Sequence, residues 1–231
     1  MRVLIKFSGE ALKNQDKVFD AANLNALAAQ VKQITDNGIG VGIVIGGGNV
    51  VRGKEFEKVG FNRIEADTIG MVATTLNCMA LAGAMKNIGM NAEVMSAVKV
   101  ESVGDIDVAR ANKLIDEGYV VLFGGGIGNP YFSTDTACAL RAIEIKAEKI
   151  LMAKNGVDGV YDSDPRVNPD AKMFTEITFD EILDKKLGVM DQTAATLCRD
   201  NGVSAFVFNA NGKNNIVKAA TGSIIGTTIK G

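Results

Sequence analysis

Short apolar runs alternate with longer amphipathic segments along this chain, and that alternation restricts the fold more than any other feature. Unbroken apolar runs predict strands at residues 3–7, 41–45, 91–95, 120–123, 149–153 and 205–208, and a final strand is expected at 223–229. Helices are expected at 21–35, 65–87, 106–117, 134–145, 178–185 and 192–201. Unbroken apolar strands are typical of a parallel sheet that is covered on both faces. The pattern therefore predicts an α/β fold, a three-layer αβα sandwich around a mainly parallel central sheet.

Four glycine-rich turns come directly after strands of this pattern, at residues 6–10, 46–49, 124–129 and 156–159. Glycine lets a backbone approach an anion closely and turn its N–H groups toward it. In open α/β sheets, ligands bind beyond the carboxyl ends of the strands, where these turns are expected. Lys6 and Arg52 flank two of the turns. The combination indicates a site that holds several phosphates, which favours phosphoryl transfer over simple nucleotide binding.

The composition excludes several classes of chemistry. The chain has no histidine, which rules out a Ser-His-Asp triad, a Cys-His pair and a histidine zinc site. A net charge of -2 gives no reason to expect a nucleic acid or an anionic membrane as partner. Cys78, Cys138 and Cys198 are far apart and odd in number, so reduced thiols in a cytoplasmic protein are expected. Transfer of a phosphoryl group to an acceptor that is already ionised needs no general base.

The length of 231 residues suits one domain. We expect two lobes within it, an N-terminal lobe of about residues 1–150 and a C-terminal lobe of about residues 151–231. A polar loop at 162–172, which contains Pro165 and Pro169, lies near the start of the second lobe. The uncharged stretch 68–85 contains threonine and asparagine, so a buried helix is expected there rather than a membrane span.

Some motifs have two interpretations. Lys6 alone fits an ordinary lysine beside a strand-end turn. Asp67 fits a carboxylate at a helix start as well as a ribose ligand. Residues 154–165 fit either a hairpin with Asp158-Gly159 as its turn or a wall around an adenine, framed by Tyr161 and Asp164.

Two turns favour a ligand more strongly. Three successive glycines at 46–48, before an expected helix start, have no packing value, and Arg52 lies where its guanidinium can clamp a phosphate. The long loop at 124–133 adds two aromatic rings, which suits a nucleobase. The alternative interpretation of Thr134 and Asp135 is that one of them only caps the helix that follows this loop.

Taken together, these segments resemble the bacterial uridylate kinases, a branch of the amino acid kinase family. The matching elements cover nearly the whole chain and are residues 6–12, 45–53, 62–63, Asp67, 70–71, 95–97, 128–135, 157–161, 164–165 and 189–191. The element Gly-Asn-Pro-aromatic-Phe-x-Thr-Asp at 128–135 is specific to the branch that uses UMP. The Lys-x-Ser-Gly element and the triple glycine are shared by the wider family.

The resemblance implies transfer of the γ-phosphoryl group from ATP to UMP, with Mg²⁺ on the ATP phosphates. It implies ATP contacts at Lys6, Phe7, Ser8, Gly9, Gly48, Arg52, Asn155, Tyr161 and Asp164. It implies UMP contacts at Gly47, Asp67, Ile127, Gly128, Asn129, Pro130, Tyr131, Phe132, Ser133 and Thr134. The implied catalytic residues are Lys6, Arg52, Asp135 and Asp191, with the two aspartates organising lysine and magnesium-bound water. Ile127 and Asn155 stand where the family commonly has threonine, so Ile127 has only its backbone N–H to offer.

The resemblance further implies a cytoplasmic homohexamer built from dimers, without nucleic-acid or membrane partners, that makes pyrimidine nucleotides and is often regulated by GTP and UTP. In it, the N-terminal lobe takes the acceptor and the C-terminal lobe takes ATP.

Two alternatives remain. A phosphotransferase of the same fold that acts on a carboxylate or carbamate fits Lys6 and the glycines at 46–48, but it fits Arg52 and the aromatic loop poorly. A non-catalytic nucleotide sensor or storage protein is disfavoured by the joint presence of Lys6, Arg52 and the two aspartates.

Overall fold

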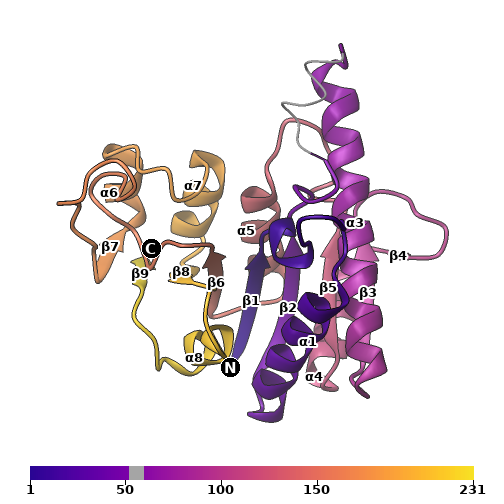
Figure 1. Cartoon of the computed structure of the whole chain (residues 1–231). Coiled ribbons are helices and arrows are strands. Elements are labelled where there is room, and N and C mark those ends of the chain that lie inside the picture. The colour runs from indigo at the N-terminus through magenta and orange to yellow at the C-terminus, as the bar shows by residue number, and fades with distance from the viewer. Residues whose placement is uncertain (52–59) are drawn as a thin grey trace.

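The computed structural model describes residues 1–51 and 60–231, and its centre is one sheet of nine strands. The strand order is β4-β3-β5-β2-β1-β6-β8-β9-β7 (Figure 1). The strands are β1 (Arg2–Phe7), β2 (Gly40–Ile45), β3 (Ala92–Ser96), β4 (Gly104–Asp105), β5 (Val120–Gly124), β6 (Lys149–Lys154), β7 (Glu176–Thr178), β8 (Ser204–Asn209) and β9 (Thr227–Lys230). β9 runs antiparallel to β8, and the other paired strands of the described chain are parallel. The predicted α/β class with a mainly parallel sheet is confirmed.

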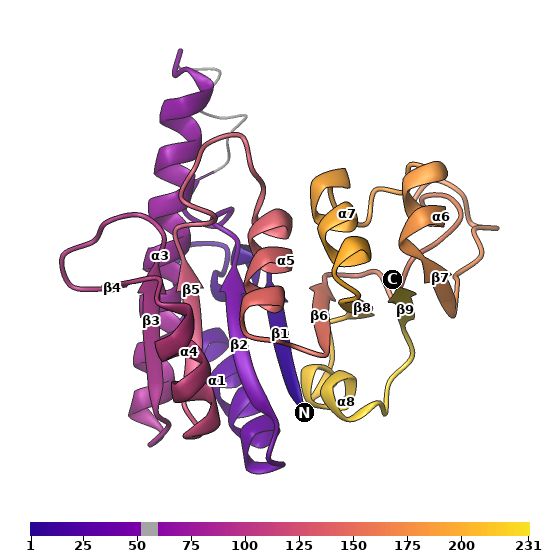
Figure 2. The ribbon, with the colours of Figure 1, turned by 180° about the vertical axis from the view of Figure 1, so that it is seen from behind.

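Helices cover both faces of the sheet, as Figure 2 shows from behind. The helices α1 (Ala21–Asp36), α3 (Arg63–Asn87) and α8 (Asn215–Thr221) enclose one apolar core with β1 and β2. The helices α4 (Val108–Asp116), α5 (Thr134–Glu144), α6 (Phe179–Asp184) and α7 (Gln192–Asp200) enclose a second core on the opposite face. β1 contributes to both, because Leu4 packs in one core and Ile5 in the other. The strands at the centre of the sheet are therefore buried on both faces, which explains their unbroken apolar sequences.

Polar side chains cap the starts of the helices other than α8, and left-handed glycines follow the ends of α1, α3, α4, α7 and α8. Asp20 caps α1, and Asn62 with Glu65 forms a capping box at the start of α3. Gly38 and Gly202, which follow the ends of α1 and α7, adopt left-handed φ angles of 74° and 65° that suit a helix end. These signals place the helix ends within two residues of the predicted positions.

The helix α3 is the one helix of the described chain that is long and apolar enough to cross a membrane by length and composition. Half of that stretch is buried inside the protein, as in the core helix of a globular fold. The expected helix after the triple glycine cannot be compared, since it falls largely on residues 52–59, outside the described residues.

The sequence pattern misses the 3-10 helix η1 (Gly9–Leu12) and the elements β4, β7 and α8. Each is seven residues or shorter, and α8 starts after Asn214, a left-handed residue that makes no side-chain cap. The hairpin interpretation of residues 154–165 is wrong. The chain after β6 does not fold back onto it, because Val160 N donates to Thr227 Oγ1 (2.8 Å), at the start of β9. The division into an acceptor lobe and an ATP lobe stays a prediction.

Candidate active site

The carboxyl end of β1 holds an ion pair between two residues that the sequence assigns to catalysis. Lys6 Nζ lies 2.8 Å from Oδ1 of Asp135, the second residue of α5. Both side chains are mostly shielded from solvent, with 16% and 18% exposed. In such a site the carboxylate fixes where the ammonium lies, and the pair interacts more strongly than it would on the surface.

Asp191 lies beside this pair as the N-cap of α7. It accepts a hydrogen bond from Ala194 N (3.0 Å) and from the hydroxyl of Thr136 (3.1 Å to each oxygen), and it also accepts from the hydroxyl of Ser133. The two hydroxyls come from the first turn of α5 and its cap. Asp191 therefore joins the N-termini of α5 and α7. These contacts do not test the catalytic role predicted for Asp191, which stays a prediction.

The loop that follows β2 is held against the turn that follows β1. A side chain at Gly9 would place a Cβ 2.3 Å from Oδ1 of Asn49 and 2.4 Å from the carbonyl oxygen of Gly46, so only glycine fits there. The two predicted phosphate turns thus pack directly on each other. Gly48 has open space where its side chain would be, whereas Gly47 packs against the carbonyl oxygen of Gly70 in α3. Arg52, the predicted phosphate clamp, lies outside the described residues.

Two asparagines hold the triple-glycine loop in place. Asn49 Nδ2 donates to Asn77 Oδ1 (3.0 Å), and Asn77 Nδ2 lies 2.7 Å from Asn49 Oδ1 and from the carbonyl oxygen of Gly46. Asn77 is fully buried in α3. The sequence motifs do not include this residue. The signal that could have indicated it is an amide in an otherwise apolar helix, because a buried amide needs partners.

The long loop between β5 and α5 depends on left-handed residues and close backbone contacts. Gly125 and Gly128 have φ angles of 77° and 86°, and a Cβ at Gly125 would lie 2.6 Å from Ala97 N. Tyr131 is also left-handed, with φ 72°. The loop carries the predicted UMP residues Ile127, Gly128, Asn129, Pro130, Tyr131, Phe132 and Ser133.

Asp67 of α3 binds this loop directly. Its Oδ2 accepts from Tyr131 N (2.7 Å) and from Arg63 Nε (3.0 Å), and the Arg63 guanidinium lies 5.3 Å from the centre of the Tyr131 ring. The rings of Tyr131 and Phe132 remain exposed at 61% and 48%. The structure thus brings together Asp67 and Tyr131, which are 64 residues apart. Ser133 caps α5 by accepting from Asp135 N and Thr136 N, so the alternative in which Thr134 or Asp135 is the cap is wrong.

A cavity of about 610 Å³ lies beyond the end of β6 and contains the residues predicted for adenosine. Asn155, Tyr161 and Asp164 line it, and Lys154 and Arg166 line it as well. Arg166 forms two hydrogen bonds of 3.0 Å with Asp164, which hold the pKa of that carboxyl below its ordinary value. The volume suits a small-molecule ligand such as a nucleotide. Lys154 and Arg166 were absent from the predicted site.

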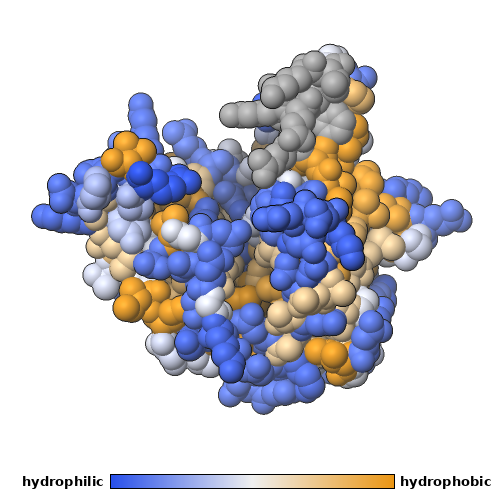
Figure 3. Space-filling view, viewed as in Figure 1, coloured by the Kyte–Doolittle hydropathy of each residue, from blue (hydrophilic) through white to orange (hydrophobic). Residues whose placement is uncertain are grey.

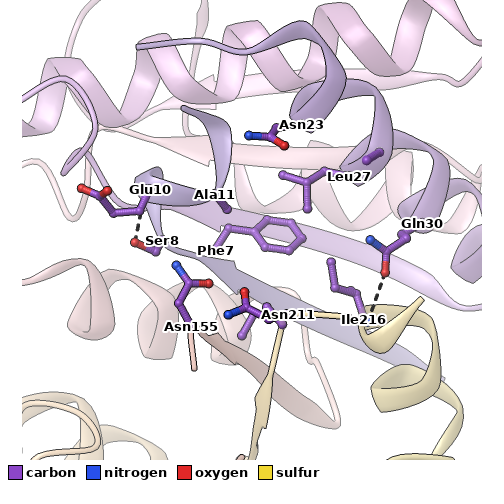
Figure 4. Close-up of a pocket in the computed structure, with 13 residues that line it drawn as sticks. Phe7, Ser8, Glu10, Ala11, Asn23, Leu27, Gln30, Asn155, Asn211 and Ile216 are labelled. Atoms are coloured by element: carbon purple, nitrogen blue, oxygen red, sulfur yellow. Dashed lines mark hydrogen bonds between the residues drawn. The ribbon is translucent and has the colours of Figure 1, made fainter. Parts of the chain in front are cut away.

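A smaller cavity of about 280 Å³ adjoins the same edge between α1 and α8 (Figure 4). Phe7, Ser8 and Asn155, all predicted ATP contacts, line it together with Glu10 and Asn211. The Phe7 ring is buried, and Ser8 Oγ accepts from Glu10 N (3.3 Å). Phe7 is almost fully buried although it lines this cavity, so its predicted contact with ATP stays a prediction.

The described chain holds no group of three acidic or cysteine side chains that would bind a metal ion by itself. Mg²⁺ in nucleotide sites usually takes one or two carboxylates together with substrate phosphates. Asp135 and Asp191 offer such carboxylates at the end of the sheet, so the residues fit an ion that arrives with ATP.

The three cysteines are free and buried. Burial raises the pKa of Cys78 and of Cys198 to about 12. Burial, and then the nearby charge of Asp135, raise the pKa of Cys138 well above its ordinary value. A protonated buried thiol is a poor nucleophile, so covalent chemistry at cysteine is excluded near the Lys6–Asp135 pair.

Comparisons with known proteins agree with this geometry. Residues 1–209 match the profile of the Amino acid kinase family. Uridylate kinase of Streptococcus thermophilus is 45% identical over 230 residues, which cover 99% of this chain and 94% of that protein. Uridylate kinase of Mesoplasma florum is also 45% identical, over 99% of this chain and 97% of that protein. The crystal structure of UMP kinase from Ureaplasma parvum superposes with a TM-score of 0.95 and 40% identity, covering 100% of this chain and 98% of that one. The chain belongs to the amino acid kinase family.

Proposed function

We propose that this chain transfers the γ-phosphoryl group of ATP to UMP, giving ADP and UDP. The observation that supports this most directly is the Lys6–Asp135 pair, which lies where two glycine turns and the Asp67-bound aromatic loop meet the end of the sheet. The 45% identity to proteins named uridylate kinase selects UMP as the acceptor.

The reaction needs alignment more than acid–base chemistry. A UMP phosphate is already ionised near neutral pH, so it attacks the γ-phosphorus without a base, and the histidine-free composition is no obstacle. Lys6 neutralises charge on the transferring group, and Asp135 keeps its ammonium in position. Backbone N–H groups of the turns after β1 and β2 hold the phosphates in line.

The loop between β5 and α5 is proposed to select the acceptor. Asp67 fixes the loop through Tyr131 N, which leaves the two aromatic rings exposed for the nucleobase side of UMP. The cavity around Tyr161 and Asp164 is proposed to take the adenosine of ATP. Arg52 is proposed to clamp a phosphate, as its sequence position suggests.

We infer that Asp135 and Asp191 would hold the water shell of a Mg²⁺ ion bound to the ATP phosphates. The ion neutralises negative charge on the phosphates. The residues of the chain then only orient the ion, which agrees with the small number of carboxylates at the site.

We also propose that the protein assembles as a homohexamer from dimers that meet at α3. Figure 3 shows hydrophobic residues gathered over this helix. Ile64, Val72, Leu76 and Met79 recur at helical spacing and are between 37% and 52% exposed. An apolar face of this kind favours a second copy of the chain, because isolated proteins rarely expose a continuous apolar stripe. A cytoplasmic location, a role in pyrimidine nucleotide synthesis and regulation by GTP and UTP are proposals that rest on the resemblance of the sequence to the bacterial uridylate kinases.

An acceptor screen tests the proposed activity. The full-length protein with ATP and Mg²⁺ is offered UMP, CMP, carbamate, glutamate or aspartate, and ADP release is measured. UMP is expected to give the fastest release. ADP release with carbamate or an amino acid, but not with UMP, would contradict this proposal. It would support the alternative of a phosphotransferase that acts on a carboxylate or carbamate.

A further inference from the structure

Lys154 is a second lysine on the same face of the sheet as Lys6. In the pairing of β1 with β6, Lys6 lies opposite Met152. Lys154 is two residues beyond Met152 and ends β6, so its side chain points to the same side, one step closer to the carboxyl edge. This is the face covered by α5 and α7, where Asp135 and Asp191 lie.

The ammonium of Lys154 is half-buried and donates to the carbonyl oxygen of Val189 (2.7 Å). No carboxylate of the described residues lies within ion-pair distance of it, whereas Lys6 has Asp135. Burial and the nearby charge of Lys6 lower the pKa of Lys154, and Asp135 opposes them. The ammonium groups of Lys6 and Lys154 thus both lie near the carboxylate of Asp135, whose one negative charge balances only one of them. A positive charge that is shielded from water is normally paired with an anion.

The position of Lys154 identifies that anion. It lines the 610 Å³ cavity together with Tyr161 and Asp164, where the adenosine is proposed to lie. Lys6, proposed to hold the γ-phosphoryl group, is on the neighbouring strand β1. A nucleotide that extends from the cavity to Lys6 carries its α- and β-phosphates past Lys154.

We propose that Lys154 binds the β-phosphate of ATP and stabilises the charge that develops on ADP as it leaves. The proposal rests on ATP being the phosphoryl donor. In the transfer, a phosphate oxygen of UMP forms a bond to the γ-phosphorus. The bond from that phosphorus to the bridging oxygen breaks, and its electron pair stays on the β-phosphate of ADP. An ammonium directed at that oxygen lowers the barrier, because its interaction strengthens as the charge develops.

A purely structural role makes a different prediction. The Val189 carbonyl lies two residues before Asp191, so the same hydrogen bond tethers the loop that leads into α7. If Lys154 only holds the loop through the Val189 carbonyl, a neutral side chain that can still donate a hydrogen bond will preserve nucleotide binding. If the charge binds phosphate, only another cation will.

Four variants separate these roles. Lys154→Gln keeps a donor without the charge, Lys154→Met keeps the length without either, and Lys154→Arg keeps the charge. Lys149→Gln, at the opposite end of β6, is the matched control. Binding of ADP and of AMP is measured by calorimetry without UMP, and the KM for ATP, the KM for UMP and kcat are measured in turnover.

We expect Lys154→Gln and Lys154→Met to weaken ADP binding by about tenfold or more, as for other hydrogen bonds to charged groups. AMP binding stays within about twofold, because AMP has no β-phosphate and only that contact is lost. The KM for ATP rises and kcat falls, while the KM for UMP is unchanged. Lys154→Arg and Lys149→Gln stay near wild type in ADP affinity.

Two results would overturn the assignment. One is an ADP affinity of Lys154→Gln equal to that of wild type, which would show that Lys154 only holds the loop before α7. The other is an equal loss of ADP and AMP binding, which indicates a damaged cavity. If Lys154→Met fails to fold, the Gln and Arg variants still decide by their ADP affinities. ADP binding needs no acceptor, so a failure of Lys154 here is distinct from a failure of the chain to phosphorylate UMP.

Discussion

Lys6 and Asp135 meet 2.8 Å apart across the end of the sheet, one from β1 and the other from α5. Within the described residues the ammonium is paired with the carboxylate of Asp135, and it faces the edge where the glycine turns converge. It is therefore positioned before any nucleotide enters, and little reorganisation is needed when phosphate charge develops.

Replacing Lys6 with alanine should abolish most turnover. We expect kcat to fall by about 10²–10³-fold, the usual effect of removing one donor aimed at developing charge. UMP affinity, measured by calorimetry, should be unchanged. Lys32→Ala, an exposed lysine paired with Asp36 on α1, is the control and should keep full activity. Near-normal turnover of Lys6→Ala would refute the role given to Lys6.

Asp67→Asn should act on the acceptor and leave ATP unaffected. The change removes the charge that holds Tyr131 N and Arg63, so the loop before α5 loses its anchor. The KM for UMP should rise by about tenfold, equivalent to about 1.4 kcal/mol. The KM for ATP should stay constant in the same steady-state assay. Glu117→Gln, an exposed carboxylate of the α4 end, serves as the control; equal effects on both substrates would contradict the assignment.

Gly9→Ala should destabilise the fold. The added methyl group would overlap the Asn49 side chain and the Gly46 carbonyl at distances below 2.5 Å, so the two phosphate turns must move apart. A cost of about 1–3 kcal/mol is typical of such overpacking, which corresponds to a Tm lower by roughly 2–12 °C for a chain of this size. Gly104→Ala on β4, where the added Cβ meets only the Arg110 guanidinium at 3.6 Å, should leave the Tm unchanged. Calorimetry of both variants checks the contrast.

The longer strands and helices could be predicted from the sequence because their signals are local, whereas the roles of the site residues stay predictions. Apolar runs indicated the strands, amphipathic segments indicated the helices, and glycines indicated the turns. The partners that hold the site could not be predicted in this way. Asn77 binds Asn49, 28 residues away, and Asp67 binds Tyr131, 64 residues away, so both contacts exist only once the sheet order is known.

Lys154 shows the same limit. The sequence offers only a hairpin or an adenine wall for residues 154–165, because nothing local distinguishes a shielded lysine from a surface lysine. Its meaning came from the pairing of β6 with β1 and from its neighbour Lys6.

The buried thiol of Cys198 should make the stability of the fold depend on alkaline pH. Its pKa is about 12 in the folded protein against 9.0 for a free thiol, so the unfolded chain loses the proton first. The buried, protonated thiol of Cys198 makes its full contribution to the free energy of unfolding below pH 9. That contribution falls as the pH rises toward 12. The destabilisation caused by Cys198→Ala, measured with urea, should therefore shrink by about 1.4 kcal/mol between pH 8 and pH 10. A pH-independent difference would contradict the raised pKa.

Leu76→Asp should dissociate the proposed assembly. Leu76 lies at the middle of the exposed apolar face of α3, and a buried unpaired carboxylate is costly at an interface. Light scattering coupled to size-exclusion chromatography should show a smaller species than for wild type. Ile225→Asp changes an equally apolar side chain that is 72% exposed elsewhere, and it should leave the assembly intact. A wild-type protein that is already monomeric would refute the proposed hexamer.

The measurement that tests the central claim most directly is the stoichiometry of products. The full-length protein is incubated with ATP, Mg²⁺ and UMP, and the nucleotides are resolved by mass spectrometry. Formation of UDP and ADP in equal amounts, lost in Lys6→Ala and absent without UMP, is the predicted result. Nucleotide binding without UMP-dependent ADP would contradict the account and identify the chain as a nucleotide-binding protein that does not transfer phosphate.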